Sequence, residues 1–390
     1  MTRQVPPRGF PVIEFERRLA GAQRAMAAAK LDGLLLTTEP ELRYFSGFRT
    51  LFWQSPTRPW FLFVPREGKP VAVIPEIGAA LMRRTWVDDI RTWSAPRPDD
   101  DGLSLLADLF APIDGRRGRI GIPMGHETML RMPFNDFARL RTMLPSIEFA
   151  DATPIVRSLR MVKSEAEIAK IAHVCDIVSE VFEDAASLFH QGQPLVEAFR
   201  AFRIACIGRG TDDIPFLAGG AGPGGYDDII SPPSDRVLAA GDVLMLDTGN
   251  TFDGYFCDFD RNFAIGRADD ESKRAYETLN RSMDAGLAAA RPGTTCRELH
   301  RAMRAVTAEI DPNGQEVGRF GHGLGMQLTE WPSHAEFDET VLVENMTLTL
   351  EPSLAYGDGR FMVFEENIVV RDGEPQLLTR RAPPTLPVIG

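Results

Sequence analysis

The chain has 390 residues, which is longer than one hydrophobic core usually spans, so we expect two domains. Its 43 Lys and Arg residues against 55 Asp and Glu residues give a net charge of -12, which argues against nucleic acid and anionic membranes as partners. The sequence shows no secretory leader and no apolar run of transmembrane length, and we therefore expect a cytoplasmic protein.

The first 155 residues predict an α/β domain. Apolar positions at helical spacing that end at a glycine predict a helix over residues 14–33. The apolar segments LDGLLLTT, PWFLFVP and KPVAVIP predict strands because turn residues or prolines flank them, and NDFARLRTML predicts a later helix. Strands that alternate with helices indicate a sheet covered by helices.

The pattern changes near residue 156, where we place the start of a second domain, residues 156–390. The stretch PIVRSLRMVKSEAEIAKIAHVCDIVSEVFEDAASLF predicts one long amphipathic helix with a Ser-x-x-Glu cap near Ser164. The elements beyond it predict an α+β domain. We expect helices at about 195–209 and 270–290 and strand pairs at about 243–265 and 346–370.

Two features argue against other kinds of site. The glycine-rich segment 218–228 lacks the Gly-Lys-Ser/Thr ending of a phosphate clamp, so we expect a loop near a site. The four cysteines lie far apart and form no Cys-x-x-Cys pair, which argues against a zinc finger or a disulfide framework.

Acidic residues occur inside a segment that otherwise predicts buried structure. DVLMLDTGNTFDGYFCDFDRNFAIG predicts a β-hairpin with its turn at Asp253-Gly254. Asp258, Asp260 and Asn262 share one face of the second strand, and Asp247 ends the first. Paired strands would bring Asp247 close to Asp258, and like charges at that distance need a compensating cation.

A second acidic pair and one histidine complete a set of metal donors. Glu351 ends the apolar strand MTLTLEPSL, and Glu365 and Glu366 lie in the middle of the strand FMVFEENIVV. A buried carboxylate is costly unless it is paired or binds a metal. Together with His322 in GHGLGMQLTEWP, the acids suit two divalent ions of the Mn, Fe, Co or Zn kind that share an attacking hydroxide. Taken alone, His322 is more often a structural residue than a ligand.

These segments resemble, in order, the pita-bread metallopeptidase family of aminopeptidase P, prolidase, methionine aminopeptidase and the metal-free creatinase. The resemblance rests on LDTGNTFDGYFCDFDRNF, GHGLGMQLTEWP, LTLEPSL and MVFEENIVV, with LRMVKSEAEIAKI as the helix that leads into the domain. It implies a creatinase/prolidase-like α/β N-terminal domain over residues 1–155 and an α+β pita-bread catalytic domain over residues 156–390. It further implies a homodimeric, dinuclear-metal hydrolase of the Xaa-Pro peptidase type, which cleaves a small peptide or amide bond.

The resemblance also implies roles for individual residues. The implied metal ligands are Asp247, Asp258, His322, Glu351 and Glu365, and all five are present, which argues against a metal-free enzyme of the creatinase kind. Manganese is the expected metal, with iron, cobalt or zinc as alternatives. Glu351 is the expected general base and, with His322, the expected catalytic residue.

Two departures from the family concern groups that would contact the scissile amide. Family peptidases carry a histidine shortly before the Gly-Asp that opens the hairpin, whereas this region reads YDDIISPPSDRVLAAGD. They carry a second histidine where this chain has Thr329, which donates one hydrogen bond but carries no charge. His334 is a candidate replacement, although we expect it in a loop or on the surface.

The N-terminal domain contributes candidate substrate-binding residues beside Thr329. In GFRTLFWQSPTRPWFLFVP, aromatic residues surround arginines, in a part of the domain that the family often lends to the active site across a dimer. Trp53 and Arg49 are the candidates, because such aromatics box a cation or a proline-like ring. Phe61 and Phe63 are expected in the core, and the place of Trp60 stays open.

Two further hypotheses remain beside the peptidase. In the first, the same fold and metal site act on a small non-peptide metabolite, as in relatives of the ectoine hydrolase or dimethylsulfoniopropionate lyase kind, and the two absent histidines favour this hypothesis. The other hypothesis is a catalytically silent scaffold. The complete ligand set argues against a scaffold, because five costly buried groups serve no purpose there.

Overall fold

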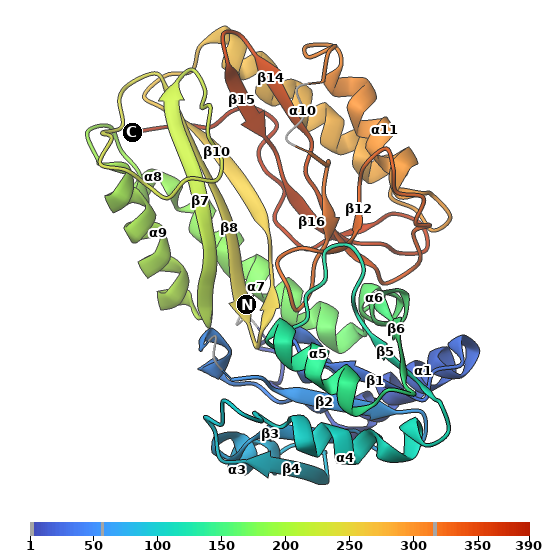
Figure 1. Ribbon diagram of the computed structural model, residues 1–390. Helices are drawn as coiled ribbons and strands as arrows, with labels where there is room; N and C mark the ends of the chain where they lie inside the picture. Colours follow the sequence, from blue (N-terminus) through green and yellow to red (C-terminus); the bar gives the residue numbers. More distant parts are fainter. Residues whose placement is uncertain (1–3, 56–57, 315–317) are drawn as a thin grey trace. The chain divides into compact units, whose positions relative to one another are not determined.

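The computed structural model of the protein describes residues 4–55, 58–314 and 318–390 (Figure 1). The chain forms two compact units, Pro7–Arg160 and Met161–Gly390, and residues 4–6 group with the second unit. We call them the N-terminal unit and the C-terminal unit. Within the described residues, no helix is both long enough and apolar enough to cross a membrane.

The N-terminal unit is a mixed sheet with helices packed on it. Its strands are β1 (Gly33–Leu36), β2 (Phe61–Pro65), β3 (Val71–Pro75), β4 (Asp89–Trp93), β5 (Arg119–Ile122) and β6 (Glu148–Asp151). Its helices are α1 (Val12–Ala29), α2 (Glu39–Ser46), α3 (Ala79–Met82), α4 (Leu103–Asp114), α5 (Phe134–Met143) and α6 (Thr153–Met161), with short 3-10 turns η1 (Leu51–Gln54) and η2 (Glu76–Gly78). The strand order is β4-β3-β2-β1-β5-β6, and apolar side chains of α4 and α5 pack against one face.

The elements predicted for this unit are confirmed, because each is marked by its own flanking residues. The three apolar segments form β1, β2 and β3, and the two predicted helices are α1 and α5. Helix α1 ends at Ala29 because Lys30 adopts the left-handed conformation at φ 56°. Trp60 is 1% exposed and belongs to the core, as Phe61 and Phe63 do.

The C-terminal unit combines two sheets with a strand pair. Its helices are α7 (Glu165–Glu183), α8 (Ala185–Leu188), α9 (Leu195–Arg209), α10 (Asp270–Ala289) and α11 (Cys296–Thr307). Its strands are β7 (Asp213–Pro223), β8 (Asp242–Phe252), β9 (Tyr255–Phe256), β10 (Phe259–Ile265), β11 (His322–Gly323), β12 (Glu330–Ser333), β13 (Thr347–Leu350), β14 (Ser353–Tyr356), β15 (Arg360–Val363), β16 (Glu366–Val369), β17 (Gln376–Leu377) and β18 (Val388–Ile389).

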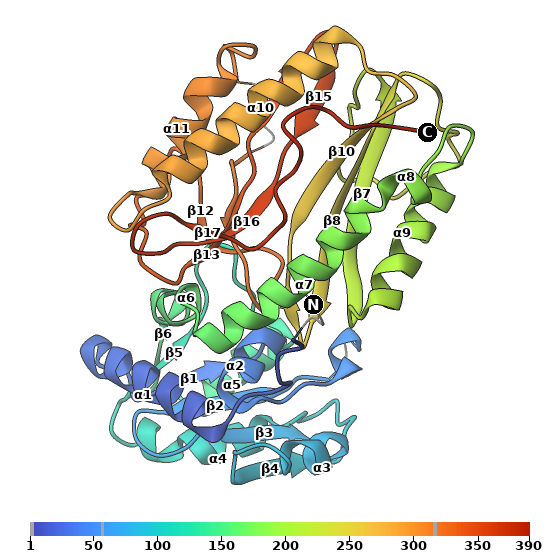
Figure 2. The ribbon, with the colours of Figure 1, turned by 180° about the vertical axis from the view of Figure 1, so that it is seen from behind.

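The sheets of this unit carry the cavity that concerns function. The first sheet has the order β18-β10-β8-β7, with β9 paired to β8, and the second has the order β12-β11-β13-β16-β17. Strands β14 and β15 pair with each other. Helices α7 and α9 pack on the first sheet, and α10 packs on α11 and on the pair β14 and β15 (Figure 2). The α+β class predicted for this part of the chain is confirmed.

The long helix predicted with its cap at Ser164 is confirmed as α7, although the stretch that predicted it also contains the separate helices α6 and α8. The chain forms α6, α7 and α8 in succession. Between α6 and α7 the backbone is extended, because Val162 bridges Met346 of a distant segment. Helix α7 then begins with a capping box, in which Ser164 Oγ accepts from the N–H of Glu167 and the Glu167 carboxylate accepts from the N–H of Ser164.

The glycine-rich segment is also not the loop that we expected over its whole length. Residues 218–223 belong to β7 and pair with β8, with Ala218 opposite Asp247. Gly219 has φ +144°, and a Cβ atom there would lie 2.1 Å from the carbonyl oxygen of Met245. Glycine therefore serves close strand pairing at this position.

The predicted hairpin is confirmed at its turn, with one change in register. Asp253 and Gly254 join β8 to β9 and both have positive φ, 48° and 72°. The second strand is interrupted after β9, and Asp258 lies in the interruption. When β10 resumes, Asp260 rather than Asp258 is the residue opposite Asp247.

The single strand predicted across FMVFEENIVV is wrong. The segment forms β15 and β16, which Phe364 and Glu365 separate, and a matching interruption at Glu351 and Pro352 separates β13 from β14. The N–H of Phe364 donates to the carbonyl oxygen of Pro352 at 3.1 Å. Strand pairing on both sides of the interruptions places them directly opposite each other. Glu351 and Glu365 therefore lie in facing interruptions of one antiparallel ribbon.

A buried arginine distinguishes Glu366 from Glu365. Arg261 on β10 pairs with the Glu366 carboxylate at 2.9 Å, and their side chains are 7% and 0% exposed. The same guanidinium donates to the carbonyl oxygens of Asp260 at 2.7 Å and Glu365 at 2.9 Å. Arg261 thus compensates the charge of Glu366 and ties β10 to the interruption that contains Glu365.

We predict that Arg261→Met destabilises the metal-free protein by roughly 3 kcal/mol, because it leaves a buried carboxylate and several carbonyl oxygens without their donor. Arg281→Met, which removes an exposed ion pair with Glu309, is the matched control and should cost less than about 1 kcal/mol. Urea unfolding followed by circular dichroism measures both. An equal loss in the free energy of unfolding for the two variants would contradict the role of Arg261 in compensating Glu366.

Candidate metal centre

The five residues that the sequence predicts as metal ligands line one cavity of the C-terminal unit. The cavity has a volume of about 300 Å3. These residues are Asp247, Asp258, His322, Glu351 and Glu365. Asp247 lies on β8 and His322 opens β11, whereas the other three occupy interruptions between strands. Interruptions free these side chains from the strict alternation of faces along a strand.

Three of the five form a compact buried group. One donor atom from each of Asp258, His322 and Glu365 lies within 4.8 Å of the others. Their exposures are 4%, 4% and 2%, so water compensates little of their charge. Within the group, His322 Nε2 lies 3.4 Å from Asp258 Oδ2.

The hydrogen bonds of His322 fix the form of the imidazole that suits a metal. Nδ1 lies 2.8 Å from the carbonyl oxygen of Gly323, so Nδ1 carries the proton and donates. Burial, together with the nearby charge of Arg319, lowers the pKa of His322 to about 4, so the ring is neutral at neutral pH. The lone pair of Nε2 consequently faces the carboxylates.

Asp258 is positioned by Asn367, a residue that the sequence analysis missed. The N–H of Asp258 donates to Asn367 Oδ1 at 2.9 Å, and Asn367 Nδ2 donates back to the carbonyl oxygen of Asp258. Cys175 Sγ also donates to Asn367 Oδ1 at 3.4 Å. The sequence feature that could have pointed to Asn367 is its amide side chain at the start of the apolar run after Glu366.

Two carboxylate oxygens of the cavity lack a hydrogen-bond partner within the described parts of the chain. Among the described residues, Asp247 Oδ1 and Glu365 Oε1 are buried without a hydrogen-bond partner. Buried carboxylate oxygens in this state are costly, which indicates that another group normally compensates them.

Burial and mutual repulsion raise the pKa values of all four acids. Burial raises the pKa of Asp247 to about 7. Burial raises the pKa of Glu351 to about 8, and the charge of Asp247 contributes. Burial raises the pKa of Asp258 well above its ordinary value, and the charges of Asp247 and Glu351 raise it further. The pKa of Glu365 is raised well above its ordinary value by burial and then by Asp258.

This arrangement fits divalent metal ions. Four carboxylates and a neutral imidazole form a hard, oxygen-rich donor set, and the unsatisfied oxygens point to missing positive charge. Two divalent cations would bring four positive charges to four negative ones. The roles of the individual residues as metal ligands remain a proposal.

The two departures from the expected peptidase pattern are visible in the cavity. Ile229 and Ile230, from the segment that lacks a histidine, line it, and so does Thr329. Thr329 Oγ1 accepts a hydrogen bond from Arg319 Nη2 at 3.4 Å. The sequence analysis missed Arg319, whose signal is a charged residue just before the apolar GHGLG segment.

Neighbours of Thr329 have structural roles that the sequence left undefined. Glu330 is buried, pairs with Lys163 at 3.2 Å and accepts from the N–H groups of Met326 and Gln327. His334 lies in the loop after β12, which is one of the two expected positions, but it is 0% exposed and therefore not on the surface. His334 does not appear in the cavity lining, which gives it no support as a replacement for the absent histidines.

Arg49 and Trp53 belong to the N-terminal unit, and their substrate-binding role remains a prediction. Arg49 is exposed. Trp53 packs against Trp60, with 5.9 Å between ring centroids, and the Arg131 guanidinium lies 5.0 Å above its ring. These contacts describe an aromatic cluster within the unit.

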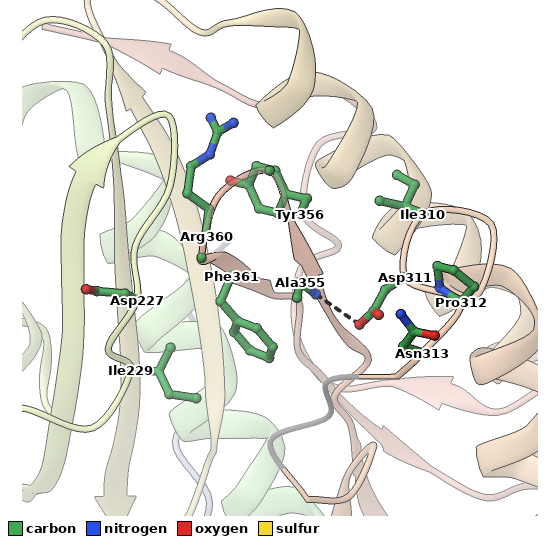
Figure 3. A pocket seen from close by; sticks show the side chains of 12 residues that line it. Asp227, Ile229, Ile310, Asp311, Pro312, Asn313, Ala355, Tyr356, Arg360 and Phe361 are labelled. Carbon is green, nitrogen blue, oxygen red and sulfur yellow. Dashed lines mark hydrogen bonds between the residues drawn. The ribbon is translucent and has the colours of Figure 1, made fainter.

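A larger cavity of about 610 Å3 adjoins the first, because Ile229 lines both. Figure 3 shows its acids on opposite sides, with Asp227 pointing away and Asp311 accepting from the N–H of Ala355 at 3.2 Å. Arg360 points out of it and pairs with Asp269 at 3.1 Å. The charged side chains of the larger cavity therefore do not converge on one point. The smaller cavity is the better candidate for a catalytic metal site.

Comparisons with known proteins agree with this choice. Residues 169–372 match the model of metallopeptidase family M24, and residues 18–162 match that of the creatinase/prolidase N-terminal domain. The probable dipeptidase PepE of Mycobacterium tuberculosis is 29% identical over 384 residues, 98% of each chain. The Xaa-Pro dipeptidase of Pyrococcus horikoshii is 24% identical over 356 residues, 90% of this chain and 93% of the relative.

A solved structure covers the same length. The crystal structure of dipeptidase PepE from Mycobacterium ulcerans superimposes with a TM-score of 0.85 at 28% identity, and the match covers 98% of this chain and 99% of that one. The likeness therefore includes both units and the segments around the cavity.

We predict that His322→Ala abolishes stable metal binding, because it removes the one nitrogen donor of the compact group. Metal analysis after dialysis should find about two equivalents in the unchanged protein and little in the variant. His190→Ala, at an exposed histidine of the same unit, is the control and should keep its metal. Full metal content in His322→Ala would remove His322 from the ligand set.

The raised pKa values predict a pH dependence in the metal-free protein. Above pH 7 the histidines of the unfolded chain no longer titrate, while Asp247 and Glu351, with pKa values of about 7 and about 8, still hold protons in the folded state. The folded protein then binds more protons than the unfolded one, so the free energy of unfolding falls as pH rises.

The expected fall between pH 7 and 8.5 is about 1.4 kcal/mol per pH unit for each extra proton. Urea unfolding of chelator-treated protein measures it, and added manganese should flatten the dependence because the cations replace the protons. A free energy of unfolding that rises with pH in this window would show that the acids are not buried together.

Proposed function

The chain belongs to metallopeptidase family M24, whose model matches more than half of it, and on that premise we propose that it is a dipeptidase that accepts Xaa-Pro substrates. The family predicted from the sequence is confirmed, as are the two-part fold class and the peptidase hypothesis. The chain is accordingly a metal-dependent peptide hydrolase.

One observation carries the proposal. Four buried carboxylates and a neutral histidine converge on one cavity, and two of their oxygens have no partner among the described residues. The similarity to the probable dipeptidase PepE over nearly the full length supports a short peptide as substrate.

We propose that Asp247, Asp258, His322, Glu351 and Glu365 hold two divalent ions. When bound, such ions polarise a carbonyl group and activate water for hydrolysis. Asn367 orients Asp258, and the proton on Nδ1 of His322 keeps Nε2 available, so both donors are fixed before a ligand arrives.

We propose that Glu351 also moves the proton of the reaction. Its carboxylate lines the cavity, and burial raises its pKa to about 8, although bound cations would lower that value. A carboxyl group that titrates near neutral pH is suited to general base catalysis. His322, which we earlier expected among the catalytic residues, acts in this proposal as a ligand.

The comparisons with relatives favour the peptidase hypothesis, although the sequence lacks the two histidines that family peptidases carry. The metabolite hypothesis and the silent scaffold gain no support from the relatives described above, which carry dipeptidase names. The apolar Ile229 and Ile230 and the hydroxyl of Thr329 give the cavity a different lining, suited to small uncharged side chains of a peptide.

Finer features belong to the proposal as well. Manganese is the metal we propose, with iron, cobalt or zinc as alternatives, because oxygen-rich sites suit manganese. We propose a cytoplasmic homodimer. The four cysteines, all free and buried, support a reducing compartment, and the homodimer rests on the resemblance to the family.

We predict that the protein loaded with manganese hydrolyses alanyl-proline and alanyl-alanine. Glu351→Gln should lower kcat by at least about 100-fold, as loss of a general base does, while most bound metal remains. Glu344→Gln, at an exposed glutamate of the same unit, is the control and should leave kcat unchanged. Liberated amino acid and bound metal are measured on the same samples.

Two outcomes would count against the proposal. Full turnover by Glu351→Gln would exclude Glu351 from proton transfer. The absence of dipeptide hydrolysis with all four metals would contradict the dipeptidase function itself.

A further inference from the structure

Asp260 is an additional buried carboxylate beside the four that line the metal cavity. Its exposed fraction is 2%. Strand β10 places Asp260 directly opposite Asp247 of β8 in the antiparallel pair. Residues opposite each other project from the same face of a sheet, with Cβ atoms about 5 Å apart. Asp260 is therefore a neighbour of Asp247, although Asp260 itself does not line the cavity.

The two oxygens of the Asp260 carboxylate have different surroundings. Oδ2 accepts a hydrogen bond from Asn262 Nδ2 at 2.7 Å. The same amide nitrogen also donates to the carbonyl oxygen of Val363 at 2.7 Å, and Asn262 Oδ1 accepts from the Tyr226 hydroxyl at 2.9 Å. The Asn262 amide is thus fully engaged. In the described parts of the chain, Asp260 Oδ1 is buried without a hydrogen-bond partner.

The arginine next in sequence does not bind this carboxylate. The Arg261 guanidinium donates to the backbone carbonyl oxygen of Asp260 at 2.7 Å and pairs with the carboxylate of Glu366 at 2.9 Å. A buried carboxylate oxygen that lacks a partner is costly, which indicates that another positive group normally compensates it.

The charge of Asp260 acts on the same acids as the cavity does. Burial raises the pKa of Asp260 well above its ordinary value, and the charge of Asp247 raises it further. The pKa of Glu365, raised first by burial and then by Asp258, is also raised by the charge of Asp260. Cations bound between these acids would therefore lie within the field of Asp260 as well.

We propose that Asp260 supports the metal centre from outside the ligand set, where its negative charge strengthens the binding of the cations beside Asp247. The inference rests on the proposed function. Groups behind a metal ligand typically contribute about 10- to 100-fold to metal affinity. Manganese binds protein donors more weakly than iron, cobalt or zinc, so the added attraction matters most for manganese.

The experiment titrates the chelator-treated, full-length protein with manganese alone and follows free manganese by electron paramagnetic resonance. Asp260→Asn keeps the shape of the side chain and an oxygen that accepts from Asn262, but it removes the charge. It should lower the manganese affinity by about 10- to 100-fold. Asp260→Glu keeps the charge and should lose less affinity than Asp260→Asn.

Asp242→Asn is the matched control. Asp242 is also on β8 and is 1% exposed, but its carboxylate pairs with Arg236 at 2.7 Å. Removing this charge should leave the manganese affinity unchanged, because Asp242 does not line the metal cavity and is paired within the protein.

Urea unfolding of the metal-free variants separates a role of the charge from a structural role. Asp260→Asn removes a buried charge that lacks a partner, so it should not lower the urea midpoint. Asp242→Asn breaks an ion pair and should lower the midpoint. The proposal thus predicts weaker metal binding without lost stability in one variant, and lost stability without weaker metal binding in the other.

The outcomes separate this inference from the proposed function. Unchanged manganese affinity in Asp260→Asn would overturn the inference and leave the metal centre standing. Weaker binding together with a lower urea midpoint of metal-free Asp260→Asn would assign Asp260 a structural role and overturn the inference as well. The absence of manganese binding by the unchanged protein would overturn the proposed metal centre, and this inference with it.

Discussion

The concentration of negative charge in one buried cavity is the constraint on which the C-terminal unit depends. Some buried acids of this region are compensated by buried cations, and others line the cavity. Arg261 pairs with Glu366 and Lys163 pairs with Glu330. Among the described residues, the acids of the cavity form no ion pair with a lysine or arginine, and burial raises their pKa values. A site of this kind is stable when divalent cations supply the missing charge.

The backbone serves the same constraint by interrupting strands where an acid must turn inward. Glu351 and Glu365 lie at facing interruptions of one ribbon, and Asp258 lies at the interruption between β9 and β10. A continuous strand would send neighbouring side chains to opposite faces. Asn367 then fixes the backbone of Asp258 on both sides, through its N–H and its carbonyl oxygen. Rigid placement of donors before binding lowers the cost of ordering them.

Two polar side chains lie beside the acids in the lining of the cavity. Thr329 and Arg319 both line the cavity, and the Thr329 hydroxyl accepts a hydrogen bond from the Arg319 guanidinium. Arg319 thus places a guanidinium among the carboxylates of the cavity.

Local signals in the sequence predicted the ligand types, the cap at Ser164 and the turn at Asp253-Gly254, because each depends on residues within a few positions. The family resemblance of four sequence segments predicted five candidate metal ligands, and the structure brings all five to one cavity. Only the tertiary structure decided which acids stay unpaired, since the partner of Glu366 is 105 residues away and Asn367 is 109 residues from Asp258. Arg319 at the cavity, His334 in the interior and the break between β15 and β16 likewise depend on pairing between distant segments. Burial and hydrogen bonding across such separations leave no pattern in a short window of sequence, and for that physical reason they had to be observed.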